Sequence, residues 1–207
     1  MDCGGRRSLQ DLTLPDYTAQ RRDELLSLYT QLEKRIQQLD KQVETEARQR
    51  PQARRLLTHP GVGPVTALAT GVFLGNPDRF AGANQVASYI GMIPCEHSRG
   101  KRQRLGKLSK EGNSLLRYLW TEATLHAAVK DPELKRFYRR KLVQKGMGKA
   151  RVATARKLGI GLWIMLRDEI DYEEFCRRGK LPQKGRAHAG VPDYNSGPAR
   201  AVTGSTE

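Results

Sequence analysis

Residues 56–68 read LLTHPGVGPVTAL, and the rest of the chain is organised around this stretch. Gly61 and Gly63 bracket one apolar residue and are flanked by apolar runs, which is the pattern of a helix-hairpin-helix. Glycine lets the chain turn at positive φ, and the following helix begins with free N–H groups that can bind a phosphate. We therefore interpret Gly61, Gly63 and Thr66 as candidate phosphate contacts. The alternative is an ordinary glycine cap between two packed helices.

A cationic segment follows the hairpin. The stretch from His97 to Lys110 contains no acidic residue but carries Arg99, Lys101, Arg102, Arg104, Lys107 and Lys110. Asn113 then caps a predicted helix, with Arg117 one turn further on. We expect these side chains to contact nucleic acid, although Arg117 can equally be part of an internal ion pair. Residues 92–106 form either a two-stranded arm or an ordered loop.

The charge of the whole chain favours a polyanionic partner. Its 37 Lys and Arg outnumber 22 Asp and Glu, which gives a net charge of +15 that is spread through the predicted helices. Such an excess is typical of proteins that bind DNA or structured RNA. The longest apolar run, 158–166, is far shorter than the roughly 20 residues needed to span a bilayer, and no signal peptide is evident. We expect no membrane association.

The cysteines favour a reducing compartment and give no metal site. Cys3, Cys95 and Cys176 are odd in number and far apart, which is typical of reduced thiols in the cytoplasm. Cys95 and His97 lack the second Cys/His pair that a zinc site requires. We therefore predict a cytoplasmic protein with no metal in this chain.

The apolar pattern predicts an all-α, mostly helical protein with a coiled-coil arm. Between 17 and 50 the apolar residues recur every three or four positions, which forms a narrow seam: Leu25, Leu28, Leu32, Ile36, Leu39 and Val43. We expect the seam to pair with another helix and to make a homo-oligomer. The alternative is a single amphipathic helix that lies on its own domain. The predicted boundaries are a flexible N-terminus at 1–16, a coiled-coil helix at 17–50, a helix-hairpin-helix domain at 51–178 and a disordered tail at 179–207.

Five helices are predicted inside the domain after the hairpin begins. Capping residues and apolar periodicity place them at 66–74, 85–90, 113–129, 132–145 and 150–170, with 172–178 trailing from the last. The segment 145–148, with two glycines, is expected to be a flexible link. Val152 and Ile164 are expected in the core. Gly159 and Gly161 weaken the last helix, so we expect another helix to approach closely there.

Several short pieces resemble one family when they are taken in order. They are HPGVGP at 59–64, DRF at 78–80, QVASYIG at 85–91, IP at 93–94, LSKEGN at 108–113 and LR at 116–117. Their order and spacing resemble the C-terminal half of the insertion-sequence transposases of the one-ten family, the bridge-RNA-guided recombinases. The resemblance runs from residue 12 to 178, about four-fifths of the chain.

The resemblance implies a reaction shared between two domains. The family has an N-terminal RuvC-like domain whose carboxylates hold Mg²⁺, a coiled coil, and a helical transposase domain whose serine attacks DNA. This sequence begins at the coiled coil, so we expect the RuvC-like domain and its Mg²⁺ to come from a separate subunit. We expect no cofactor in this chain and no activity from it alone. A structured guide RNA is implied as a second partner.

The serine of the resemblance is Ser98, with Ser109 as the fallback. The family loop commonly reads Ser-Ser-Gly, whereas this sequence has Ser98-Arg99-Gly100. If the first serine of the family loop is the nucleophile, Ser98 serves; if the second is, Arg99 has replaced it. His97 is within reach as a base. The alternative interpretation of Ser98 is a solvated loop residue in a DNA-contacting arm.

Two functions of different classes therefore remain open at the level of sequence. The first is the DNA-binding C-terminal part of an insertion-sequence transposase, acting in DNA transposition and recombination in the bacterial cytoplasm at the nucleoid. The second is a helix-hairpin-helix module that binds DNA or RNA without chemistry. A third possibility, a coiled-coil scaffold for proteins, leaves the charge of +15 unexplained.

Overall fold

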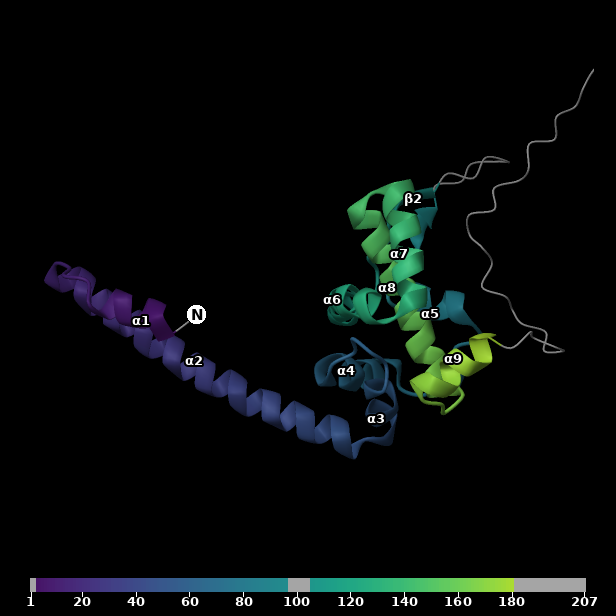
Figure 1. Ribbon diagram of the computed structural model, residues 1–207, viewed down its shortest axis with the longest axis horizontal. Helices are drawn as coiled ribbons and strands as arrows, with labels where there is room; N and C mark the ends of the chain where they lie inside the picture. Colours follow the sequence, from purple (N-terminus) through teal and green to yellow (C-terminus); the bar gives the residue numbers. More distant parts are fainter. Residues whose placement is uncertain (1–2, 97–104, 181–207) are drawn as a thin grey trace, which may run out of the picture.

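Helix α2 (Asp16–Gln49) is a single 34-residue helix that extends away from the rest of the molecule (Figure 1). The computed structural model describes residues 3–96 and 105–180. Pro15 precedes α2, and Pro51 stands two residues after it as the first residue of the next helix, α3 (Pro51–Leu57). Proline lacks the N–H that a continuing helix needs, so it is found at the start of helices and not inside them. Both predicted ends of this helix are confirmed within one residue.

The apolar seam of α2 is uncovered in the described part of the chain. Five of its members are 50–57% exposed: Leu25, Leu28, Leu32, Ile36 and Leu39. The buried residue of α2 is Ala47, near the C-terminal end where the helix contacts the domain. The seam therefore does not pack against the domain of its own chain, and the alternative of a helix that lies on its own domain is wrong.

The N-terminal segment contains a helix that the sequence pattern did not predict. We expected a flexible segment, but α1 (Cys3–Gln10) forms and folds back along the first turns of α2 (Figure 1). Arg22 of α2 explains its position. Its Nη1 donates to the carbonyl oxygens of Leu9 and Gln10, at the end of α1, at 3.4 and 3.3 Å, and to that of Leu12, just after the helix, at 2.9 Å.

Helix α8 (Met147–Arg167) lies at the centre of the domain. It contacts α3, α4 (Pro64–Leu74), α5 (Ala83–Tyr89), α6 (Ser114–Lys130), α7 (Pro132–Lys145) and the 3₁₀ turn η1 (Pro77–Arg79). Its buried residues occur throughout its length from Ala150 to Leu166. A helix that is apolar on nearly all sides is expected in the middle of a bundle. Val152 and Ile164, however, were predicted to be buried and are only partly so.

The close helix approach predicted at Gly159 is confirmed. A Cβ atom on Gly159 would overlap the six-membered ring of Trp120, which projects from α6. Trp120 is 1% exposed, and its Nε1 donates to Thr70 Oγ1 of α4 at 3.0 Å. Gly161 faces Phe175 of helix α9 (Tyr172–Lys180), where a Cβ would lie 3.4 Å from Cζ. Gly159 thus allows α6 to pack directly on α8.

Of the two predictions for segment 92–106, the two-stranded arm is the one found in its described residues. Strand β1 (Pro94–Glu96) pairs antiparallel with β2 (Leu105–Leu108), with Pro94 opposite Leu108 and Glu96 opposite Leu105. The connection between them, 97–104, lies outside the described residues.

Most predicted helix ends are correct within three residues, and the capping residues are confirmed. Asn113 Oδ1 accepts from the N–H of Leu116 at 2.8 Å. Asp131 Oδ1 accepts from the N–H groups of Glu133 and Leu134 at 2.7 and 3.1 Å. Each cap satisfies donors that a helix start leaves free.

The ends of α8 and α9 correct two predictions. The link expected at 145–148 is reduced to Gly146, whose φ of +77° turns the chain directly into α8. The tail was predicted to start at residue 179, but this position is still part of α9, which continues to Lys180. Residues 181–207 lie outside the described residues. None of the described helices combines the length with the apolar character that crossing a bilayer requires.

We predict that Gly159→Ala destabilises the domain by about 1–3 kcal/mol, because the added methyl group must displace the Trp120 ring or move α6 away from α8. Urea denaturation followed by circular dichroism measures the change. The matched control is Gly148→Ala in the same helix, where a Cβ meets nothing within 4 Å. That variant should be neutral or more stable by up to about 1 kcal/mol. Equal effects of the two substitutions would contradict the packing argument.

Candidate nucleic-acid interface

The hairpin turn between α3 and α4 packs against α6. Gly61 has a φ of +94°, and a Cβ there would overlap the backbone of Ala127, lying 2.6 Å from its Cα. Val62 is buried at 6% exposure. The glycine at this position is therefore required for close contact with α6. The structure gives Gly61 a packing role, which corresponds to the alternative considered for this turn.

The outer side of the turn is formed by Gly63 and Val65. Gly63 is exposed and stands at the N-cap of α4, followed by Pro64, which has no N–H. The free N–H groups of this first turn therefore belong to Val65 and Thr66. Thr66 is only 8% exposed, whereas Val65 is 47% exposed. Of the three hairpin residues predicted to contact phosphate, Gly63 is the exposed one.

A buried polar cluster lies beneath the turn. His59 is 3% exposed, its Nδ1 donates to the carbonyl oxygen of Pro60 at 3.1 Å, and its ring centroid lies 4.6 Å from that of Tyr172. Burial lowers the pKa of His59, although the nearby Asp131 carboxylate opposes this effect. The imidazole is accordingly neutral near pH 7.

Tyr172 joins the same cluster from α9. Burial raises the pKa of its phenol well above the ordinary value, and hydrogen bonds to Cys176 and Asp131 raise it further. The phenol therefore stays protonated and is unsuited to act as a nucleophile. The cluster connects the hairpin, the start of α7 and α9. Sequence reasoning missed it because His59, Asp131 and Tyr172 are more than forty residues apart from one another in the chain.

Two glycines hold the base of the β arm against α5. Gly91 and Gly112 have φ values of +72° and +105°, and Cβ atoms on them would overlap the backbones of Glu111 and Tyr89 respectively. The strands continue this contact, because the N–H groups of Ser109 and Lys110 donate to the carbonyls of Ile93 and Gly91 at 2.8 and 3.2 Å. The arm therefore starts from a rigid base.

Some of the predicted site residues of the arm lie within the part of the chain that the structure describes, and the others do not. Lys107 and Lys110 are exposed near the base of the arm, and Ser109 is partly buried. The remaining residues of this group lie outside the described residues: His97, Ser98, Arg99, Lys101, Arg102 and Arg104.

Asn113 and Arg117 have roles inside the protein. The Asn113 side-chain oxygen is used by the α6 cap. Arg117 Nη1 donates to the carbonyl oxygen of Ile90 at 2.8 Å, which ties α6 to the end of α5. Arg117 is thus used inside the protein through a hydrogen bond to a carbonyl, whereas the alternative considered from the sequence was an internal ion pair.

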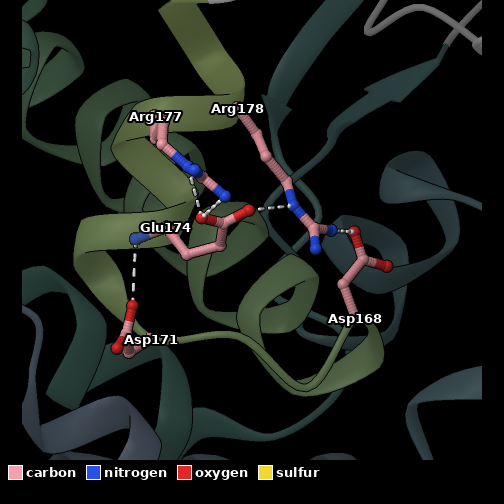
Figure 2. A network of polar contacts seen from close by, with 5 residues as sticks. All are labelled: Asp168, Asp171, Glu174, Arg177 and Arg178. Atoms are coloured by element: carbon pink, nitrogen blue, oxygen red, sulfur yellow. Dashed lines mark hydrogen bonds and ion pairs between the residues drawn. The ribbon is translucent and has the colours of Figure 1, made fainter.

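Two cations of α9, Arg177 and Arg178, are also used internally. Figure 2 shows Glu174 between Arg177 and Arg178, with Oε2 2.6 Å from Arg177 Nε and Oε1 2.9 Å from Arg178 Nε. Arg178 also reaches Asp168 at the end of α8, at 3.5 Å, while Asp171 accepts from the N–H of Glu174 at 2.9 Å. Hydrogen bonds from the two guanidinium groups lower the pKa of Glu174. This end of the domain therefore presents little net charge.

Helix α7 differs, and the sequence pattern did not single it out. It carries six basic residues and one acid, and four of the basic side chains are exposed together: Lys135, Arg136, Arg139 and Arg140. The signal in the sequence was their spacing of i, i+1, i+4 and i+5, which places all four on one face of a helix.

The carboxylates offer no metal site in the described part of the chain. Within 3–96 and 105–180, no three His, Cys, Asp or Glu side chains gather so as to hold an ion. The Mg²⁺ that the family resemblance implies therefore has no fitting set of ligands among these residues.

Comparison with known proteins places this architecture in a family. Residues 53–139 match the model of the Transposase IS116/IS110/IS902 family. The chain is 32% identical over 145 residues to a probable family 20 transposase of Pseudomonas aeruginosa, covering 68% of this chain and 43% of that protein. It is 30% identical over 152 residues to the transposase for insertion sequence element IS1111A of Coxiella burnetii, covering 70% and 42%.

A third relative, the transposase for insertion sequence element IS1328 of Yersinia enterocolitica, is 28% identical over 106 residues, covering 51% of this chain and 32% of that protein. The chain thus spans less than half the length of these curated relatives. The matched region contains the hairpin turn, the β arm, α6 and the first half of α7. Through residues 53–139, the chain belongs to the Transposase IS116/IS110/IS902 family.

Proposed function

We propose that this chain is the DNA-binding part of an insertion-sequence transposase and acts in DNA transposition and site-specific recombination. The observation that carries the proposal is the match of 53–139 to the transposase family, because this region includes both the hairpin and the cationic arm. The net charge of +15 supports a phosphate-rich partner. Structured guide RNA is a second proposed partner, and the bacterial cytoplasm, at the nucleoid, is the proposed location.

Among the predicted site residues, we propose the exposed ones as contacts to the nucleic-acid backbone. Gly63 and the Val65 N–H lie on the outer side of the turn, and Lys107 and Lys110 are exposed on the arm. The sequence adds the other cations of the arm: Arg99, Lys101, Arg102 and Arg104. We leave out Gly61, Thr66, Asn113 and Arg117, because packing, burial or internal hydrogen bonds account for them.

For the chemical step we propose Ser98 as the nucleophile, with Ser109 as the fallback. The serine oxygen forms a bond to phosphorus while the bond from phosphorus to one deoxyribose oxygen breaks. The serine proton passes to a base such as His97, and the leaving oxygen takes up a proton. We propose that a RuvC-like partner supplies the metal-binding carboxylates. The second candidate, a binding module without chemistry, is favoured by Arg99 in the place where the family commonly has its second serine.

We also propose that two copies of the chain pair through α2. A seam that is 50–57% exposed along Leu25–Leu39 leaves apolar area in water, and a coiled-coil partner would remove it. A second copy of the same helix offers the same spacing.

The wild-type chain should bind duplex DNA with strong salt dependence, because each neutralised phosphate contributes a slope of about −0.9 to log K against log salt. Fluorescence anisotropy titrations between about 50 and about 200 mM salt measure this slope. Lys107→Gln with Lys110→Gln should make the slope less negative by about 2. A wild-type affinity that does not change with salt would argue against DNA binding through phosphates.

Leu32→Asp should dissociate the oligomer, because it puts a charge in the middle of the apolar seam, where Leu32 is 54% exposed. Sedimentation velocity gives the size of both forms. Gln37→Asp is the matched control, since Gln37 is exposed on the other side of the same helix and both changes have a similar intrinsic cost to the helix. If the wild type sediments as a monomer, the pairing of α2 is disproved.

The chain alone should form no covalent adduct with DNA when Mg²⁺ is added. With a RuvC-like partner present, an adduct should form that Ser98→Ala abolishes and Ser109→Ala retains. Denaturing gels with labelled DNA detect the adduct. An adduct made by the isolated chain would refute the need for a partner, and an adduct that survives Ser98→Ala would move the role to Ser109 or out of this chain.

A further inference from the structure

Helix α7 separates an inward face from a cationic outward face. The inward face includes Leu134, which is 4% exposed, and the partly buried Phe137 and Tyr138, and α7 packs on α6 and α8. Four exposed cations occupy positions i, i+1, i+4 and i+5 on the side away from Leu134: Lys135, Arg136, Arg139 and Arg140. The last of them, Arg140, also has its Cζ 5.5 Å from the centroid of the Phe137 ring. We refer to these four residues as the α7 cationic face.

The α7 cationic face has no neutralising acid among the described residues. Glu133 is the one acid of α7, and its Oε2 lies 3.8 Å from Lys157 Nζ on α8. In the part of the chain that the structure describes, no ion pair is formed by Lys135, Arg136 or Arg139. Some exposed cations of α2, by contrast, pair with an acid one turn away, as Arg48 does with Glu44 at 2.6 Å.

Like charges one turn apart destabilise a helix, so this arrangement does not serve the stability of α7. Lys135 and Arg139 form one such pair, and Arg136 and Arg140 form another. Packing and capping hold the helix in spite of them. Asp131 caps its start, and the Phe137 ring is contacted by Lys141 and Lys157 at 5.6 and 5.2 Å from its centroid. The charges are therefore presented on a rigid support.

We propose that the α7 cationic face is a second DNA-binding surface that contacts the phosphate backbone of a duplex. This inference rests on the proposed DNA-binding function and assigns to it a site separate from the hairpin and the arm. The charge density supports a duplex: Lys135 to Arg140 rise about 7.5 Å along the helix axis, and duplex DNA carries about four phosphates in that length. A single strand carries about half as many.

The position of α7 suits a ligand that also contacts the arm. In Figure 1, α7 and strand β2 lie toward the same end of the molecule in this view, whereas α2 extends to the other side. Val143, 89% exposed one turn beyond Arg139, continues the same face and adds no charge. Between Lys135 and Val143, a backbone ligand that runs along this face therefore meets cations and no carboxylate of α7.

The test removes three charges from α7 and three from α2 in separate variants. The α7 variant carries Lys135→Gln, Arg136→Gln and Arg139→Gln. The matched control carries Lys34→Gln, Arg35→Gln and Lys41→Gln, which are exposed on α2. Anisotropy titrations use the full chain, a duplex DNA of about two helical turns and a structured RNA hairpin, each between about 50 and about 200 mM salt.

We expect the α7 variant to bind duplex DNA at least about tenfold more weakly at the lower salt, with a slope less negative by about 2 to 3. The control should change the affinity by less than about threefold. A charge-conserving variant, Arg136→Lys with Arg139→Lys, should keep the wild-type slope. The circular dichroism and melting temperature of the α7 variant should be unchanged or higher, because it removes repulsion.

The outcomes separate this inference from the proposed function. If the wild type shows no salt-dependent binding to DNA, the proposed function fails and the inference fails with it. If the wild type binds but the α7 variant matches it, or loses no more than the α2 control, the inference is wrong and the proposed function stands. Loss for the RNA hairpin alone, with DNA binding intact, also overturns the assignment of this face to DNA.

Discussion

The contact of the Trp120 ring with Gly159 is the constraint on which the domain depends. A tryptophan is large, and here it is almost completely buried, so it can lie between α6 and α8 only where the facing helix has no side chain. Its indole N–H would be costly to bury alone, and Thr70 of α4 accepts its hydrogen bond. One side chain thereby determines the mutual positions of three helices.

The same helix, α6, receives the hairpin on another part of its surface. Gly61 brings the turn onto the backbone of Ala127, and the cluster of His59, Asp131 and Tyr172 completes the contact from below. These requirements limit what the turn can offer to a ligand. The residues that face α6 are committed to packing, so only the outer side of the turn remains for a phosphate.

The cations of the chain fall into two groups with different physical roles. Some are satisfied within the protein: Arg22 at the end of α1, Arg117 on the Ile90 carbonyl and Arg178 on Asp168 and Glu174. Others, namely Lys107 and Lys110 on the arm and Lys135, Arg136 and Arg139 on α7, are exposed and form no ion pair in the described chain. The cations of the second group are therefore available to a phosphate-rich partner.

Sequence alone determined the features that depend on near neighbours. The proline ends of α2, the caps at Asn113 and Asp131 and the helical class all follow from residues within one turn of each other. The close approach at Gly159 was also predictable, because glycine inside a long apolar helix has a cost that packing must offset. The matching pieces from 59 to 117 likewise indicate the transposase family by their order and spacing along the chain.

Only the tertiary structure decided which partner each of these residues meets. Gly61 and Arg117 suited a phosphate site by residue type, but their neighbours, Ala127 and Ile90, come from other helices. Helix α1 was missed for the same reason, since Arg22 of the next helix satisfies its end. The physical reason is that residue type sets what a group can bind, whereas the packing of distant helices determines which groups are buried and already paired.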